Sequence, residues 1–193
     1  MRDQALAQLR AYLQHFPDEA ARLEALGAQL EQDPSDPLWR GNLRGHVTTS
    51  AFVLDATGRR LLMIRHRLIG RWLQPGGHCE GDAGLWQSAC REVAEETGLE
   101  ALSPHPAWGP ELPLDIDTHA IAANPAKGEG AHWHHDYAYL MRASAERPLQ
   151  AQLAEVSAAA WVDLQSLAEE GGQGEPRWPR LLAKLAALGL KAG

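Results

Sequence analysis

The sequence predicts an α/β fold with a helical extension at its N-terminus. Runs of apolar and β-branched residues at 45–54 and 60–66 are typical of strands, and 114–121 alternates apolar with polar residues as a half-buried strand does. Residues 85–97 carry apolar side chains at helical spacing. Strands mixed with amphipathic helices around one core are typical of the α/β classes. A chain of 193 residues is long enough for one domain with an appendage.

Residues 1–37 are expected to form a helical extension and a linker, and residues 38–193 the main domain. Leucines recur at helical spacing in 6–13 and again in 23–30, which predicts two helices. The stretch 32–37 contains two prolines and reads as the linker. We expect the two helices to serve as a packing appendage or a dimerisation element, with a substrate lid as the functional alternative.

The segments of the main domain follow one another with clear turn signals. Residues 45–54 and 60–66 are expected to pair as a hairpin around the turn at 55–58. The later segments comprise strands at 114–121, 131–141 and 160–163, helices at 164–170 and 179–190, and loops at 104–113, 122–130 and 171–175.

The most informative stretch of the chain places three glutamates on one short helix. Glu92, Glu95 and Glu96 are separated by one to four residues, so a helix brings them onto one arc. Like charges at this spacing cost about 0.2–0.5 kcal/mol per pair. A hard divalent cation with oxygen ligands would offset that cost. Asp82 is expected to cap the start of the helix, and Gly98 to end it.

The stretch that contains these glutamates resembles the Nudix box, in which a glycine, five residues, a glutamate and seven residues precede Arg-Glu-hydrophobic-any-Glu-Glu-any-Gly-hydrophobic. The residues that match at the matching spacing are Gly77, Arg91, Glu92, Val93, Glu95, Glu96, Gly98 and Leu99. Ala83 stands where the family has its first glutamate. The run from Arg71 to Gly77 also resembles the family's approach to the box, and the likeness extends over residues 43–164. It implies a Nudix α/β/α sandwich with a mixed sheet.

The resemblance implies a set of catalytic and metal-binding residues. Mg²⁺ or Mn²⁺ would be held by Glu92, Glu95 and Glu96, with the backbone carbonyl of Gly77 as a further candidate ligand. Arg91 would orient a glutamate rather than touch the substrate.

Substrate contacts are expected from two further places in the chain. The family often places basic groups near the phosphates at the end of the second strand, where this chain has Arg65 and Arg67. The loop at 122–130 is small, polar and rich in glycine, as substrate loops often are. Glu129 in that loop is a candidate general base.

Ala83 leaves three expectations open for the missing carboxylate. Asp82 or Glu80 takes its place from the loop, histidines supply the missing ligand, or the enzyme is slow or inactive.

Histidines form the second notable cluster. Five of the nine histidines are His46, His119, His132, His134 and His135. His132 and His134 lie two residues apart, so one face of a strand presents both to one ion, and the strand of His119 is expected to lie nearby. Imidazole suits Zn²⁺, Ni²⁺, Mn²⁺ or iron better than Mg²⁺. A metal or phosphate contact by these three histidines is therefore an expectation. Trp133 and Tyr137, on the opposite face, are expected to pack in the core.

The composition of the chain limits which partners and which cellular location are expected. The net charge is −7, with 25 acidic and 18 basic residues, so a nucleic-acid polymer is not expected as a partner. The two cysteines, Cys79 and Cys90, predict no disulfide framework and hence a reducing cytoplasmic location. No apolar run approaches the roughly 20 residues of a membrane span. The expected partner is a small-molecule diphosphate, and the terminal helices offer surfaces for a homodimer.

The sequence thus predicts a metal-dependent hydrolase that cleaves a pyrophosphate bond in a nucleoside diphosphate derivative or a similar small diphosphate. Two alternatives stay open. Cys79 and the histidines faintly resemble those of isopentenyl-diphosphate isomerase, which shares the fold. Ala83 favours a catalytically weak Nudix-like nucleotide-binding module. The substrate is left open among ADP-ribose, nucleoside diphosphate sugars, dinucleoside polyphosphates, oxidised nucleoside triphosphates and coenzyme A.

Overall fold

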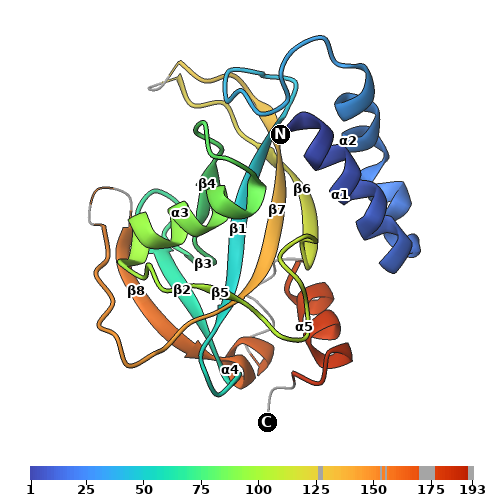
Figure 1. Ribbon diagram of the computed structural model, residues 1–193. Helices are drawn as coiled ribbons and strands as arrows, with labels where there is room; N and C mark the ends of the chain where they lie inside the picture. Colours follow the sequence, from blue (N-terminus) through green and yellow to red (C-terminus); the bar gives the residue numbers. More distant parts are fainter. Residues whose placement is uncertain (126–127, 153, 155, 170–176, 191–193) are drawn as a thin grey trace.

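In the part of the chain that the structure describes, eight strands form one mixed sheet with helices on both of its faces (Figure 1). The computed structural model describes residues 1–125, 128–152, 154, 156–169 and 177–190. Its helices are α1 (Arg2–His15), the short 3₁₀ helix η1 (Pro17–Glu19), α2 (Ala20–Gln32), α3 (Leu85–Thr97), α4 (Leu164–Glu169) and α5 (Arg177–Ala187). Its strands are β1 (His46–Leu54), β2 (Arg60–His66), β3 (Trp72–Leu73), β4 (Gly76–His78), β5 (Ser103–Pro104), β6 (Asp115–Ile121), β7 (His132–Arg142) and β8 (Val156–Asp163).

The centre of the sheet is the parallel pair β1 and β7, which runs in register from His46 opposite His134 to Leu54 opposite Arg142. Parallel neighbours need a long crossover connection, and α3 lies within it. On the far side of β7, strand β6 pairs antiparallel. On the far side of β1, the short strand β4 pairs near its start and β2 at its end, so the predicted hairpin is confirmed. The strands that carry the clustered histidines are therefore neighbours, as expected.

Alternating side chains of the central strands fill two separate hydrophobic clusters. Ala51 and Val53 of β1 pack in one cluster with residues of α1, α2 and α3. Phe52 and Leu54 point the other way and pack with α4 and α5, through side chains such as Leu181. The predicted α/β/α sandwich is confirmed, because both faces of the sheet are covered by helices (Figure 1).

The N-terminal helices share their core with the sheet. Leu9 and Leu26 are almost completely buried in the same cluster as the residues of α3. The hydroxyl of Tyr137 on β7 donates to the carbonyl of Ala5 at 3.0 Å. The hydroxyl of Tyr139 donates to Oε1 of Gln8 at 2.6 Å. The extension therefore packs against the core of the main domain, while its boundary at residue 37 and its roles as a dimerisation element or substrate lid stay predictions.

Several boundaries differ from those that the sequence predicts. Gly98 ends α3 with a φ of 74°, as expected of a left-handed C-terminal glycine. The N-cap is Gly84, so the capping role expected of Asp82 is wrong. Strand β8 begins at Val156, four residues earlier than expected, and α5 begins at Arg177. The predicted loop at 171–175 and part of the 122–130 loop lie outside the described residues.

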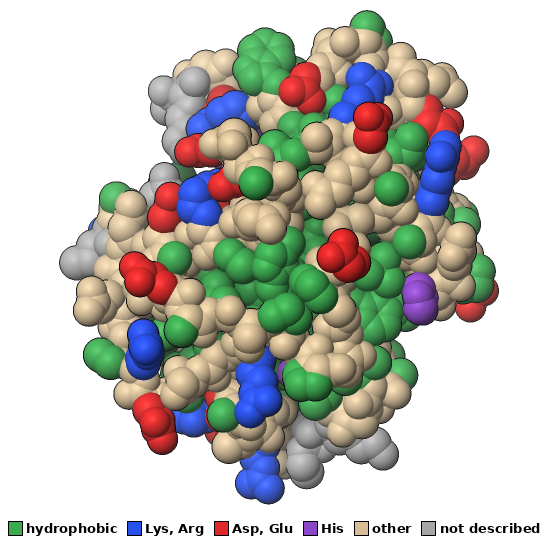
Figure 2. Space-filling model, viewed as in Figure 1, with side chains coloured by type: hydrophobic (Ala, Val, Ile, Leu, Met, Phe, Trp, Pro, Cys, Tyr) green, Lys and Arg blue, Asp and Glu red, His purple; other side chains and the backbone are tan. Residues whose placement is uncertain are grey.

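Charged and apolar side chains are interspersed on the face of the molecule shown in Figure 2. Apolar side chains gather near the middle of this face, beside α3, with acidic and basic groups scattered around them (Figure 2). Within the part of the chain that the structure describes, no helix has both the length and the apolar character of a membrane span.

Candidate active site

A cleft of about 680 Å³ lies where α3, the glycine loop and the histidine-bearing strands meet. Its lining includes the three glutamates of α3, Gly76 to His78 of β4, and His119 and His134 on β6 and β7. Thr48, Ser50 and Asp136 add polar groups from the central strands. Three separate segments that the sequence singled out thus contribute residues to one cleft.

Helix α3 presents its glutamates to the cleft because its opposite face is buried. Ala89 and Val93 are completely buried in the core, which fixes the rotation of the helix about its axis. Glu92 and Glu96 are mostly buried, whereas the side chain of Glu95 is 53% exposed. The three carboxylates therefore differ in hydration although they share one arc.

Arg91 joins the acidic helix to the loop before it. Its guanidinium lies 2.9 Å from a carboxylate oxygen of Glu92 and 2.9 Å from one of Glu95. It also donates to the carbonyl oxygen of His78 at 2.7 Å and to both carboxylate oxygens of Asp82, at 3.1 and 3.2 Å. The guanidinium of Arg91 thus binds two of the glutamates and two groups of the preceding loop, the His78 carbonyl and the Asp82 carboxylate. These contacts agree with the orienting role expected of Arg91. The contact between Arg91 and Asp82 also explains why Asp82 does not cap the helix.

The two glycines of β4 allow the loop to approach the glutamates closely. The amide of Gly76 donates to Oε2 of Glu96 at 2.9 Å. A Cβ atom on Gly77 would lie 2.6 Å from Oε2 of Glu92. A side chain at either position would therefore occupy space that the structure needs for β1 or for the glutamate.

Alanine at these two glycines is expected to give different defects. Gly77→Ala places its Cβ against the end of the Glu92 side chain, which can move, so we expect a folded protein with divalent-cation affinity about tenfold lower. Gly76→Ala places its Cβ 2.6 Å from the backbone oxygen of Thr49, so we expect a loss of about 1–3 kcal/mol of stability. Urea unfolding and calorimetric titration with Mg²⁺ check the two results. Equal loss of stability in both variants would contradict this distinction.

Glu92 is the carboxylate most affected by its surroundings. Burial raises the pKa of Glu92 to about 7, and the neighbouring charges of Glu95 and Glu80 add to this effect against the lowering effect of Arg91. A carboxylate with a raised pKa in a cleft is a common feature of functional sites.

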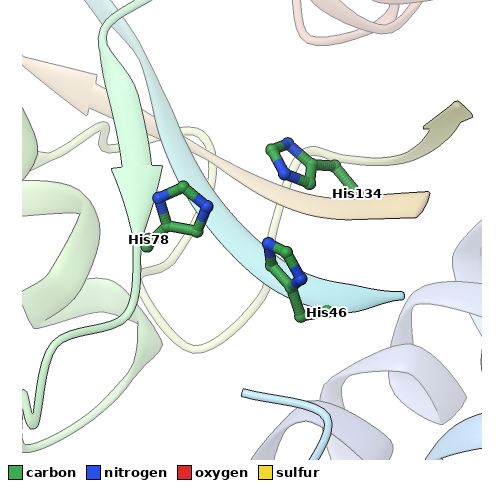
Figure 3. A group of neighbouring side chains, drawn as sticks. All are labelled: His46, His78 and His134. Atoms are coloured by element: carbon green, nitrogen blue, oxygen red, sulfur yellow. The ribbon is translucent and has the colours of Figure 1, made fainter. Parts of the chain in front are cut away.

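Three of the described histidines form a compact group at the cleft. His46, His78 and His134 come from β1, β4 and β7, and their rings point toward one another in Figure 3. Their ligand atoms all lie within 4.8 Å of one another. Burial lowers the pKa of His78 to about 4 and holds the pKa values of His46 and His134 below their ordinary value, with further lowering from neighbouring histidines. All three are therefore neutral near pH 7.

Of the three histidines expected to bind metal, the structure brings only His134 into this group. His132 lies beside it, with its Nε2 3.2 Å from Nε2 of His134. His119 is half exposed and its Nδ1 lies 3.1 Å from Asp117. The expectation that Trp133 packs in the core is wrong, because the residue is 47% exposed, whereas Tyr137 is buried as expected.

The structure places only some of the residues expected to contact substrate in the lining of the cleft. Arg67 lines the cleft, together with His66. Arg65, which pairs with Ala158 in the ladder between β2 and β8, is not among the described lining residues. The expected contact of Arg65 with phosphates is therefore not supported by the geometry. Glu129 pairs with Arg40, a lining residue, at 3.1 Å.

Sequence reasoning missed several cleft residues that the topology brings together. The sequence pattern groups His46 with the other histidines without assigning it to a site, and it gives no role to His78, which directly follows Gly77. The signal that could have found them is the strand register: His46 lies opposite His134, and His78 lies opposite Thr48, two residues along the same face of β1. Arg40 has no sequence signal of its own, whereas Asp136 shares one strand face with His132 and His134 in the sequence pattern.

Behind the cleft, α5 is held by a buried network of charges. Arg177 donates to Asp136 at 2.7 Å and to Asp115 at 3.0 Å. Arg180 and Lys184 also reach Asp115, each at 2.8 Å. Asp136 in turn accepts from Ser50 at 2.6 Å, so this network connects the floor of the cleft to the C-terminal helix.

A mixed-sheet sandwich with an acidic helix and a glycine loop at one cleft defines the class of this protein. The family model described as NUDIX domain matches residues 44–182. The chain therefore belongs to the Nudix family.

Curated relatives and solved structures agree with this assignment. An m7GpppN-mRNA hydrolase, NUDT17 of Danio rerio, is 33% identical over 141 residues, which are 67% of this chain and 44% of that protein. Phosphatase NudJ of Escherichia coli K12 is 42% identical over 62 residues, which are 31% of this chain and 39% of that protein. The chain thus spans less than half the length of these relatives.

Two solved structures show the same fold. A Caenorhabditis elegans Ap4A hydrolase complex has a TM-score of 0.52 at 18% identity and covers 73% of this chain and 95% of that chain. The Escherichia coli dihydroneopterin triphosphate pyrophosphohydrolase also has a TM-score of 0.52 at 18% identity and covers 72% and 92%. At this identity the likeness concerns the fold alone.

Proposed function

We propose that this protein is a divalent-cation-dependent pyrophosphohydrolase that acts on a small molecule containing a diphosphate, such as a nucleoside diphosphate derivative. The observation that carries the proposal is the convergence of Glu92, Glu95 and Glu96 on one cleft, with Arg91 bound to two of them. The relatives named as a cap hydrolase and a phosphatase support hydrolysis of phosphate-containing substrates. Mg²⁺ or Mn²⁺ is the proposed cofactor.

The donor groups at the cleft fit such a cation. Three carboxylates and the backbone of Gly77 supply oxygen atoms, which Mg²⁺ and Mn²⁺ prefer. Burial raises the pKa of Glu92 to about 7 despite the lowering effect of Arg91, so a further positive charge beside it would favour its ionised form. When bound, the cation would lower the pKa of a water molecule and neutralise charge on the phosphoryl oxygens.

The residues of the chain have distinct roles in this proposal. Glu92, Glu95 and Glu96 hold the cation, and Arg91 keeps two of them in place through its contacts with the loop. Arg67 and Arg40 line the cleft and supply positive charge for the outer phosphate oxygens. Glu129 remains the candidate general base, and its ion pair with Arg40 would keep it near the cleft opening. His66, also in the lining, is a further group for proton transfer.

Asp82 is proposed to compensate for Ala83 by supporting Arg91. Asp82→Asn keeps the side-chain shape but removes the charge that binds the guanidinium. We expect kcat/KM to fall about 10- to 100-fold, as for other groups that orient metal ligands. Steady-state kinetics at saturating Mg²⁺ measure the change. In the double variant Asp82→Asn/Ala83→Glu we expect partial recovery, and no loss in the single variant would contradict this role.

Mg²⁺ binding is expected to become stronger as pH rises through about 7. The pKa of Glu92 is raised to about 7, so below that pH a proton occupies the carboxylate and competes with the cation. The association constant should fall about tenfold for each pH unit below 7 and level off above it. Calorimetric titrations between about pH 6 and pH 8 measure it, with Glu92→Gln as the variant that lacks this dependence. A constant affinity over this range would contradict the assignment.

A substrate panel tests the proposed function directly. The full chain is incubated with Mg²⁺ or Mn²⁺ and with nucleoside diphosphate sugars, ADP-ribose, dinucleoside polyphosphates, nucleoside triphosphates, a capped dinucleotide and coenzyme A. Released phosphate is measured with and without a coupled phosphatase. Metal-dependent turnover of at least one compound is expected. Binding of nucleotide without turnover would favour the nucleotide-binding module.

The isomerase alternative is less well supported by the surroundings of Cys79. This thiol packs against the hydrophobic core, and burial raises its pKa to about 11. It is also absent from the described lining residues of the cleft. A cysteine that acts on substrate would need access and a reactive thiolate or an exposed thiol.

A further inference from the structure

The three histidines shown in Figure 3 are not used by the proposed hydrolysis, although two of them line its cleft. His78 and His134 belong to the lining, and His46 lies beneath them with 1% of its surface exposed. Their positions follow from the sheet register, because His46 and His134 are paired across β1 and β7. We call His46, His78 and His134 the three-histidine cluster.

The hydrogen bonds around the cluster leave one ring nitrogen of His46 without a hydrogen-bond donor. Nδ1 of His46 lies 3.3 Å from the carbonyl oxygen of Asn42, and since a carbonyl only accepts, Nδ1 must be the donor. In the neutral ring Nε2 then carries the lone pair, and this buried atom has no partner among the described residues. Leaving a buried polar atom unpaired is costly, so the site is incomplete without a further group.

A neighbouring histidine, His132, indicates which nitrogen of His134 carries the proton. Nδ1 of His132 donates to the carbonyl oxygen of Gly130 at 2.7 Å, so its Nε2 accepts, and Nε2 of the neutral His134 ring is the donor at 3.2 Å. Nδ1 of His134 then carries the lone pair of that ring. The ring of His132 stacks on that of His46 with centroids 4.9 Å apart. Histidines that donate one nitrogen to a backbone carbonyl and turn the other toward neighbouring histidines are arranged as metal ligands commonly are.

We propose that the three-histidine cluster binds a transition-metal cation of the Zn²⁺ type, at a site separate from that of the glutamates. Imidazole nitrogen is a preferred ligand of Zn²⁺, Co²⁺ and Ni²⁺, whereas Mg²⁺ prefers oxygen. Metal–nitrogen bonds of about 2.0–2.1 Å place tetrahedral ligands about 3.4 Å apart, so small rotations of the rings close the present separations of up to 4.8 Å. Three protein ligands leave a fourth position, and the lining residues His78 and His134 direct it toward the cleft, where a water molecule or an anionic oxygen fits.

The test uses Co²⁺ as a spectroscopic probe and Zn²⁺ as its competitor. Metal-free full-length protein is titrated with Co²⁺ in excess Mg²⁺, which occupies the carboxylates, and the visible absorption of tetrahedral Co²⁺ is recorded. One Co²⁺ per chain is expected, displaced by Zn²⁺ but not by more Mg²⁺. Absence of this absorption, or its displacement by Mg²⁺, would overturn the proposal.

Variants locate the ion. His78→Gln and His134→Gln are chosen because His46 is too deeply buried to be replaced without risk to folding. Each should weaken Co²⁺ binding at least about tenfold, while His15→Gln and His105→Gln, outside the cleft lining, should have no effect. Unchanged affinity in either cluster variant would refute the assignment. The variant Glu95→Gln/Glu96→Gln should keep the Co²⁺ spectrum, so failure of the hydrolase proposal is distinguishable from failure of this one.

Discussion

Replacing Glu95 and Glu96 together with glutamine is expected to lower kcat of Mg²⁺-dependent hydrolysis about 1,000-fold, which corresponds to about 4 kcal/mol of transition-state stabilisation. Both side chains line the cleft. Glutamine keeps their size, and its carbonyl still accepts the hydrogen bond that the amide of Gly76 gives to residue 96. The substitution thus removes two negative charges with little change in shape. The loss should be measured with the best substrate of the panel.

A matched control separates the loss of the site from a general loss of charge. Glu100→Gln removes an exposed carboxylate just beyond the same helix and is expected to leave kcat unchanged. Thermal unfolding should show that the double variant is at least as stable as the original, because a like-charge repulsion is relieved. Hydrolysis at the original rate in the double variant would remove these glutamates from the mechanism.

Replacing Asp115 with asparagine is expected to cost about 3–5 kcal/mol of unfolding free energy. The carboxylate is completely buried and accepts from Arg177, Arg180 and Lys184 of α5, at 3.0, 2.8 and 2.8 Å. Removing its charge leaves these buried cations with too few partners. Because Asp136 at the cleft shares Arg177 with it, we also expect weaker docking of α5 against the sheet. Urea unfolding measures the free energy.

The pH dependence of stability gives a second measure of the same network. Burial alone would raise the pKa of Asp115, but the hydrogen-bonded Arg180 and the charges of Arg177 and Lys184 hold it well below its ordinary value. The stabilisation is therefore complete above the ordinary value and is lost as pH falls through the lower folded-state value. Asp115→Asn should lack this acid-dependent loss.

An exposed ion pair serves as the control for Asp115. Arg10 and Glu31 lie 2.7 Å apart with side chains 65% and 46% exposed. Glu31→Gln should change stability by less than about 1 kcal/mol, since solvent screens such a pair. A comparable loss in both variants would show that burial of the network around Asp115 is not the cause.

The acidic helix α3 shows which features of the site a local sequence pattern can predict. The spacing of its glutamates and the glycine at position 98 depend only on the helical repeat and on the backbone freedom of glycine, and both expectations agree with the structure. Asp82 shows the limit. Its sequence position suits a helix cap, but the guanidinium of Arg91, nine residues further along the chain, competes for the same carboxylate and binds it instead.

The sequence alone determined the family resemblance, the acidic helix and the alternation of apolar side chains that separates the two faces of the sheet, because these depend on residues close together in the chain. Only the tertiary structure decided which distant residues meet. Pairing of β1 with β7 and β4 brings His46, His78 and His134 together, and packing of α5 gives Asp115 its partners. Strand register and helix docking arise from contacts between residues tens of positions apart, which no local pattern specifies.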